Sequence, residues 1–339
     1  MAPAFCTLFD SNYAAKGIAL YLSLERVMPE FTLYVMAMDR ECGRILGEAG
    51  FGRMVVECLD DIEDPELAEA RANRSRAEFC WTCGSYVTYY FFNRYRPESL
   101  TYLDSDLMFL SSPKTVLDEL EGYSVGITDH FANNTLFGRY CVQYVYFKSD
   151  EAGAAVLGWW KGECLKWCFS KLEDGKYGDQ KYLENFKDIA PGVHDIEARG
   201  AGLAYWNMFR YRFSRDGRSL SYRGVNYPVI FFHYSGVNVS LEDGLLSLKC
   251  NFHIPAAIRK HFLVPYAELL AEAYRTYLHQ DVSKLSVRPQ SRAKSVLYAI
   301  AYPLQGLALY RGAGNLYLRL KYRERKSPYS ERQYAQRKV

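Results

Sequence analysis

The chain has 339 residues, enough for one large α/β domain with an appendage or for two smaller domains. It is 49% hydrophobic and 24% charged, as is ordinary for a folded globular protein. The net charge of +3 hides an asymmetry, because residues 281–339 carry thirteen Lys or Arg against three Asp or Glu, a net of +10. The rest of the chain is therefore acidic, at −7.

Strand and helix signals alternate along the first hundred residues. Strands are predicted at Ala4–Phe9, Phe31–Met38, Gly52–Val56 and Leu100–Leu103, and helices at Tyr13–Met28, Arg40–Ala49, Pro65–Ser75 and Ser85–Tyr95. This alternation predicts an α/β fold whose mixed, mainly parallel sheet carries helices on both faces.

The rhythm changes after Asp106. Further strands are predicted at Tyr123–Thr128, Tyr140–Lys148 and Pro228–His233, and helices at Ala152–Ser170, Gly178–Phe186 and Pro265–His279. From Ile254 onward the pattern is mostly helical, so we expect a main domain at 1–255 and a helical, basic C-terminal extension at 256–339.

A charge-free run at residues 295–310 precedes the basic tail. It is shorter than the roughly 20 apolar residues of a bilayer span, and Pro303 would interrupt a helix there. The segment is either a peripheral contact with an anionic membrane surface or an ordinary packed helix followed by a basic tail. Residues Met1–Leu8 lack the basic and apolar regions of an export signal, so we expect a cytoplasmic location. This expectation includes a peripheral position at the inner membrane face.

Two carboxylates, Asp104 and Asp106, follow the buried strand Leu100–Leu103. Ligands of open α/β sheets bind at the carboxyl ends of the strands. Two acids one residue apart can converge there on a hard cation such as Mg²⁺ or Mn²⁺, which often keeps a substrate phosphate as a further ligand. The alternative is a solvated Asp-Ser-Asp turn, because Asp and Ser are common turn residues.

Three other stretches could converge on the same place. Residues 7–16 read as a strand, a polar turn and a helix start, where free N–H groups favour phosphate, although a plain βα turn is the alternative. Asp179 and Gln180 follow Gly178 at a helix start, where Asp also serves as an N-cap. His233 ends an apolar strand, and an imidazole can complete an Asp, Asp, His ligand set of the kind Mn²⁺ accepts. No GxGxxG or P-loop motif is present.

The order of these motifs resembles the nucleotide-sugar glycosyltransferases of GT-A type, in particular the retaining family of glycogenin and the lipopolysaccharide galactosyltransferases. The resemblance covers roughly residues 3–240. It implies a GT-A fold and a metal-dependent transfer of a hexose with retention of configuration. The donor would be a nucleoside diphosphate sugar, in particular a UDP-sugar. The acceptor would be a hydroxyl of a glycan or lipid-linked molecule in lipopolysaccharide or polysaccharide biosynthesis.

The resemblance also assigns roles by residue. Asp104, Asp106 and His233 look like the ligands of Mn²⁺ or Mg²⁺, and Asp179 and Gln180 like the pair facing the reactive carbon of the sugar. Donor contacts are implied for Thr7, Asn12, Tyr13, Lys16, Asp39, Arg74, Asp104 and Ser105. The chain departs from the family at Cys141, where relatives often have Asn, and at Val237-Asn238, where relatives often place a Lys.

Two rival classes are a nucleotidyltransferase acting on a sugar phosphate and a non-catalytic nucleotide-sugar-binding protein. A nucleotidyltransferase usually brings a glycine-rich, basic N-terminal loop, whereas this N-terminal turn has only Lys16. Intact acids and His233 argue against a decayed site. No nucleic-acid-binding module accompanies the basic tail, so no nucleic-acid partner is expected.

Overall fold

The computed structural model describes residues 2–62, 64–132, 136–250 and 255–289. Within them a seven-stranded sheet has the order β3-β2-β1-β4-β7-β6-β8. Its strands are β1 (Ala4–Phe9), β2 (Thr32–Ala37), β3 (Met54–Cys58), β4 (Ser99–Leu103), β6 (Val125–Asp129), β7 (Tyr140–Lys148) and β8 (Val193–Asp195). All run parallel except β7, which is antiparallel to both β4 and β6. The carboxyl ends of the six parallel strands therefore share one edge with the amino end of β7.

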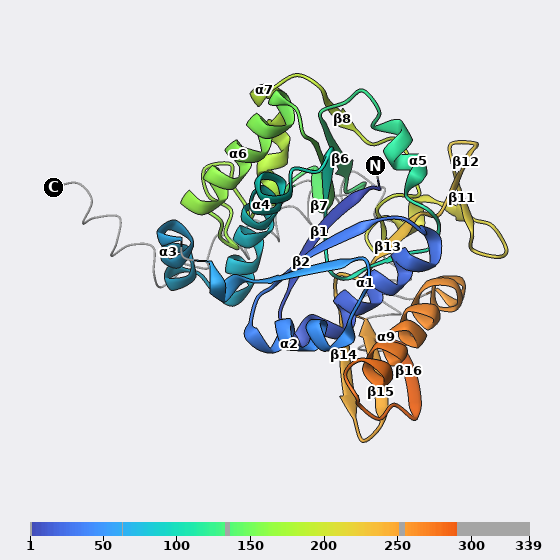
Figure 1. Ribbon diagram of the computed structural model, residues 1–339. Coiled ribbons are helices and arrows are strands. Elements are labelled where there is room, and N and C mark those ends of the chain that lie inside the picture. The colour runs from blue at the N-terminus through green and yellow to red at the C-terminus, as the bar shows by residue number, and fades with distance from the viewer. Residues whose placement is uncertain (1, 63, 133–135, 251–254, 290–339) are drawn as a thin grey trace.

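Helices cover both faces of this sheet, as the sequence predicts (Figure 1). One face carries α1 (Ala14–Val27), α2 (Arg40–Ala49) and α5 (Lys114–Glu119), and the other carries α3 (Pro65–Asn73), α4 (Arg76–Tyr95), α6 (Glu151–Lys166) and α7 (Phe186–Ile189). Strand β1 shows why two layers form, because Phe5 and Phe9 join the core on one side while Cys6 and Leu8 join the core on the other. Alternate strand residues point to opposite faces, so a strand buried on both sides is largely apolar, and Thr7 is the one polar residue of β1.

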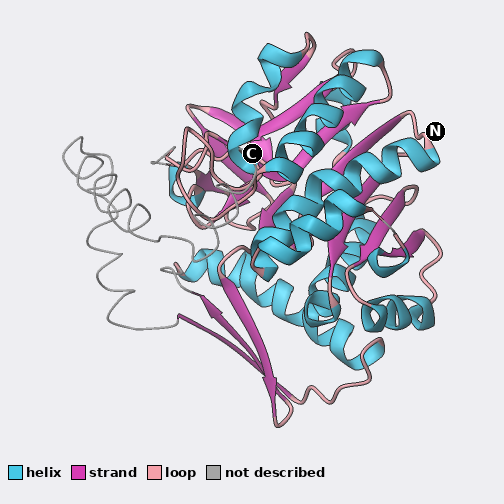
Figure 2. Ribbon diagram, turned by 90° about the vertical axis from the view of Figure 1, so that its left-hand side faces the viewer, coloured by secondary structure: helices cyan, strands magenta, loops and turns pink. Residues whose placement is uncertain are grey.

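Three smaller sheets surround the central one. They are β5 (Leu107–Phe109) with β13 (Phe231–His233) and β9 (Leu203–Ala204); β10 (Arg212–Phe213), β11 (Ser219–Tyr222) and β12 (Val225–Pro228); and β14 (Val237–Glu242), β15 (Leu245–Cys250) and β16 (Lys284–Pro289). Short helical turns are η1 (Ser11–Tyr13), η2 (Leu59–Asp61), η3 (Gln180–Asn185) and η4 (Met208–Arg210). A helical stretch runs through α8 (Ala256–Ile258), the π-helical η5 (Arg259–Leu263) and α9 (Val264–Thr276). Figure 2 shows the β14–β16 sheet extending away from the central layers.

Three of the predicted helices differ clearly from the structure. Helix α4 begins at Arg76 rather than Ser85, because Ser75 and Glu78 form a reciprocal capping box. The helix predicted at Ala152–Ser170 ends at Lys166, where Trp167 turns extended. The predicted helix Gly178–Phe186 is a 3₁₀ turn, η3, followed by the single turn α7.

The region after His233 holds strands that the sequence did not predict. Strands β14 and β15 form a hairpin. Strand β16 pairs with β15 in parallel, and it alone of the three lies in the stretch from Ile254 onward that was expected to be mostly helical. Helix α9 was expected and packs against α1, with an Arg26–Glu272 ion pair between them. A boundary near residue 255 stays a prediction. Residues 290–339, with the charge-free run and the basic tail, lie outside the described residues. Within the described ranges, no helix combines the length and the apolarity that crossing a bilayer requires.

Candidate active site

Asp104, Asp106 and His233 meet at the carboxyl edge of the sheet. Asp104 directly follows β4, Asp106 directly precedes β5, and His233 ends β13. Strands β5 and β13 are antiparallel with His233 opposite Leu107, and the Tyr234 N–H donates to the Asp106 carbonyl at 2.9 Å. This pairing carries the imidazole to the two carboxylates from a distant part of the sequence.

The three side chains form one compact group. His233 Nε2 lies 3.0 Å from Asp106 Oδ1 and 3.4 Å from Asp104 Oδ2. One ligand atom from each residue lies within 4.8 Å of the others, and in the described part of the chain no other three His, Cys, Asp or Glu residues do so. Two carboxylates and an imidazole suit Mn²⁺ and Mg²⁺, so the donor set fits a divalent cation.

Two further groups hold the carboxylates in place. The Tyr102 hydroxyl donates to Asp104 Oδ1 at 3.1 Å, and Lys16 Nζ on α1 lies 3.9 Å from Asp106 Oδ2. The Lys16 ammonium also sits 4.1 Å from the centre of the Tyr13 ring. Lys16 thus brings a nearly buried positive charge close to the Asp106 carboxylate.

The electrostatics of the triad follow from its burial. Burial raises the pKa of Asp104 to about 7, against the attraction of His233. Burial also opposes ionisation of Asp106, but His233 and Lys16 outweigh it and hold the pKa of Asp106 below its usual value. Burial disfavours the charged imidazole, yet Asp106 and Asp104 raise the pKa of His233 well above its usual value. The acids therefore need a positive partner, and the protonated His233 or a metal ion can supply it.

Asp179 lies beside this group at the start of η3. Its side chain is 6% exposed, and its main-chain carbonyl accepts a hydrogen bond from Trp160 Nε1 at 3.0 Å. Burial and then the charge of Asp104 raise the pKa of Asp179 to about 8. The side chain makes no capping hydrogen bond, so the N-cap alternative does not apply to it. Gln180 is anchored instead, because its Nε2 donates to the Phe137 carbonyl at 2.8 Å.

The predicted donor contacts cluster around the turn after β1. Thr7 is fully buried, with its hydroxyl oxygen lacking a hydrogen-bond partner among the described residues, while Asn12 and Tyr13 on η1 are exposed. Asp39 is already engaged with the chain itself. Its carboxylate caps α2 through the Cys42 N–H at 2.7 Å and accepts from the Ser11 N–H and hydroxyl at 3.1 and 3.0 Å.

Two other predicted contacts stand apart. Ser105 is half-buried between the triad carboxylates. Arg74 donates to the Thr82 hydroxyl at 2.7 Å and to the Leu165 carbonyl at 2.6 Å, partners that lie outside the triad. The donor roles of all these residues remain predictions.

A layer behind the triad was missed by the sequence reasoning. Cys141 lies between His130 and His233, whose attraction outweighs burial and lowers the pKa of its thiol to about 6. The Gln143 carbonyl accepts from the Asp104 N–H at 3.1 Å, and its fully buried side-chain amide has no partner among the described residues. The Trp206 ring stands edge-on to His233, with centroids 5.4 Å apart. Cys141 was noticed only as a departure from the family, and no local signal marks Trp206.

Comparisons with known proteins bear on the family and the fold of the chain. No family model matches the chain. The uncharacterized protein YfnF of Bacillus subtilis (strain 168) is 30% identical over 254 residues, which are 70% of this chain and 83% of YfnF. YfnD of the same organism, also uncharacterized, is 28% identical over 249 residues, 70% of this chain and 79% of YfnD.

Among solved structures, the galactosyltransferase LgtC in complex with donor and acceptor sugar analogues superposes with a TM-score of 0.51 at 15% identity, covering 80% of this chain and 99% of LgtC. An active-site mutant of LgtC gives a TM-score of 0.52 at 17% identity, with the same coverage. The fold is thus that of the GT-A glycosyltransferases, as the sequence predicted. Within that fold class, the chain belongs to the protein family of YfnF.

Proposed function

We propose that this protein is a metal-dependent glycosyltransferase that moves a hexose from a nucleoside diphosphate sugar to an acceptor hydroxyl. The observation that carries the proposal is the compact Asp104, Asp106, His233 group at the carboxyl edge of a GT-A sheet. The galactosyltransferase of that fold was solved with donor and acceptor sugar analogues, which supports a nucleotide sugar and a sugar acceptor here.

The chain supplies distinct groups for each part of the reaction. Asp104, Asp106 and His233 would hold Mn²⁺ or Mg²⁺, and the ion when bound offsets negative charge on the departing diphosphate. Lys16 places a positive charge 3.9 Å from Asp106, where it would contact a phosphate oxygen of a donor bound beside the triad. The β1–α1 turn around Thr7, Asn12 and Tyr13 would face the nucleoside, with UDP as the proposed carrier.

Asp179 and Gln180 would face the reactive carbon of the sugar. Asp179 is a buried acid beside Asp104, and Trp160 anchors its main-chain carbonyl, which supports a role for its side chain near the carbon where cationic character would develop. We propose transfer with retention, to a glycan or lipid-linked acceptor of a lipopolysaccharide or polysaccharide. The basic residues of 281–339 support peripheral contact with an anionic inner membrane face.

Donor hydrolysis tests the proposal directly. A panel of nucleotide sugars is incubated with Mn²⁺ and then with EDTA, and release of nucleoside diphosphate is measured. We expect metal-dependent release from one donor, with at least a hundredfold loss in Asp106→Asn. The matched control is Asp118→Asn, the same change on the exposed face of α5, which should behave as wild type. Absence of turnover and of metal-dependent binding for every donor would refute the proposal, and pyrophosphate release from a nucleoside triphosphate and a sugar phosphate would indicate a nucleotidyltransferase.

A further inference from the structure

A second part of the sheet edge lies on the far side of the triad from β1 and β2. Strands β6 and β8 run parallel to β4, so their carboxyl ends open at the same edge. The sheet order places β4, with Asp104, between the β1–β2 end and the β7–β6–β8 end. If the nucleotide occupies the β1–β2 end, the β6–β8 end is left for the acceptor.

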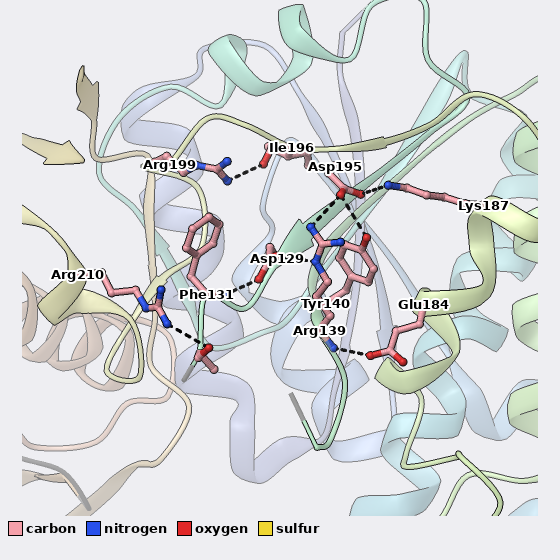
Figure 3. A network of polar contacts seen from close by, with 11 residues as sticks. Asp129, Phe131, Arg139, Tyr140, Glu184, Lys187, Asp195, Ile196, Arg199 and Arg210 are labelled. Atoms are coloured by element: carbon pink, nitrogen blue, oxygen red, sulfur yellow. Dashed lines mark hydrogen bonds and ion pairs between the residues drawn. The ribbon is translucent and has the colours of Figure 1, made fainter. Parts of the chain in front are cut away.

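Two arginines flank Phe131 just after β6. The Arg199 guanidinium carbon lies 4.3 Å from the centre of the Phe131 ring, and that of Arg210 lies 6.0 Å from it. Figure 3 shows Phe131 between the two arginines. Asp129 contacts Arg139, which in turn contacts Asp195 in a second group of polar side chains. Stacking on the ring holds the Arg199 guanidinium, which also donates to the Ile196 carbonyl at 3.4 Å. A guanidinium has five donor hydrogens, so this one bond leaves several of them available.

The neighbouring carboxylates already have partners. Asp129 accepts from the Phe131 N–H at 2.7 Å and from Arg139 Nε at 2.9 Å. Asp195 accepts from Arg139 at 3.2 Å and pairs with Lys187 at 2.7 Å. In the described ranges, no carboxylate forms an ion pair with Arg199, so its charge is not balanced locally.

The surrounding chain is strongly basic. Residues 199–223 contain six Arg and one Asp, a net of +5 in a body whose first 280 residues total −7. One of them, Arg223, lies 5.2 Å from the centre of the Tyr222 ring, and Tyr222 in turn meets Phe131 edge-on with centroids 5.9 Å apart. A small, partly enclosed pocket of about 10 Å³ lies among Asp129, Phe131, Arg199 and Tyr211.

A layer of side chains lies between the pocket and the triad. Trp206 Nε1 and Asn207 Nδ2 both donate to the His130 carbonyl, at 2.9 and 3.0 Å, and the Trp206 ring meets His233. On the other side Gly202 lines the pocket and abuts Gln143, since a Cβ at Gly202 would lie 2.5 Å from Gln143 Nε2.

We propose that the arginine pocket, lined by Phe131, Arg199 and Tyr211 and with Arg210 on the ring of Phe131, binds an anionic group, a phosphate or a carboxylate, carried by the acceptor. Arg199 supplies the principal contact, because planar guanidinium groups pair with such oxygens through two parallel hydrogen bonds. The assignment to an acceptor rests on the proposed function, whereas anion binding itself does not.

Three sugars that share one ring test the inference: D-glucose, D-glucuronate and D-glucose 6-phosphate. Their binding is measured by titration calorimetry in EDTA, so that no metal ion bridges the anion to the triad. We expect at least one of the two anionic sugars to bind at least tenfold more tightly than glucose. The anionic sugar with the higher affinity then shows whether the pocket prefers a carboxylate or a phosphate. Arg199→Gln should weaken anion binding at least tenfold, since hydrogen bonds to charged groups are the strong ones.

Matched variants separate this contact from general charge. Arg26→Gln makes the same change at the end of α1, away from the carboxyl edge, and should bind the anions like wild type. Arg199→Lys keeps the positive charge and should retain part of the affinity, which also guards against a folding defect in Arg199→Gln. Equal affinity for the three sugars, binding of none of them, or unchanged anion binding in Arg199→Gln would overturn the inference.

Donor hydrolysis in the same proteins separates the two proposals. The transferase proposal fails if wild type neither releases nucleoside diphosphate from any donor nor binds any donor in a metal-dependent way, whatever the sugars do. The arginine pocket fails on the sugar comparison alone, because that measurement needs neither donor nor metal.

Discussion

Asp39 offers the sharpest test of the donor side of the site. Its carboxylate accepts three hydrogen bonds from the chain, one from the Cys42 N–H and two from Ser11. The capping bond is worth about 1 kcal/mol. Each bond from Ser11 adds about 1 kcal/mol at this half-buried position. Asp39→Ala should therefore lower the free energy of unfolding by about 3 kcal/mol, because it frees both the start of α2 and the turn after β1.

Urea unfolding, followed by circular dichroism, measures the loss. Asp39→Asn keeps a capping oxygen and should lose only about 1 kcal/mol. The control is Asp61→Ala, which removes an exposed pair with Arg40 and should change stability by less than about 1 kcal/mol. An Asp39→Ala protein as stable as wild type would refute the reasoning and leave Asp39 as a nucleoside contact alone.

The same contact predicts a pH dependence. Burial opposes ionisation of Asp39, but the hydrogen bonds from Cys42 and Ser11 outweigh it and lower its pKa below the usual 3.8. A carboxyl with a lowered pKa stabilises the fold fully above the unfolded value, and the stabilisation is lost as the pH falls through the folded value. The difference between wild type and Asp39→Ala should thus be complete at neutral pH and shrink below about pH 3.8.

Three further outcomes are expected. Mn²⁺ at a hundred times its dissociation constant should raise the free energy of unfolding of wild type by about 2.7 kcal/mol, and Asp106→Asn should lose that gain in the same urea titration. Trp160→Phe leaves the Asp179 carbonyl without its donor and should cost about 1–3 kcal/mol, a result contradicted if stability and donor hydrolysis both stay at the wild-type level. Gly202→Ala should destabilise by about 1–3 kcal/mol, because φ is +92° there and the new Cβ would meet the Gln143 amide; an unchanged melting temperature would contradict it.

Local chemistry let the sequence determine much of the fold. Strand Ala4–Phe9, helix Arg40–Ala49 and strand Tyr140–Lys148 have the predicted bounds, because burial on both faces makes the strands largely apolar and Asp39 caps the helix. The Asp104–Asp106 pair was visible for the same reason, since a buried strand and the polar residues that follow it are neighbours in the chain.

Tertiary structure decided the contacts between distant segments. His233 became a partner of Asp104 and Asp106 only through the pairing of β13 with β5, and β16 became a strand only because β15 offers it an edge. The resemblance implied a nucleoside contact for Asp39, and only the tertiary structure showed that its carboxylate also binds Ser11 and Cys42. The local sequence determines which residues favour a helix or a strand. Bringing distant segments together costs conformational entropy, because the chain between them must close into a loop, and the contacts that offset this cost form only in the whole fold. Partners such as His233 and Asp106 therefore cannot be predicted from one segment alone.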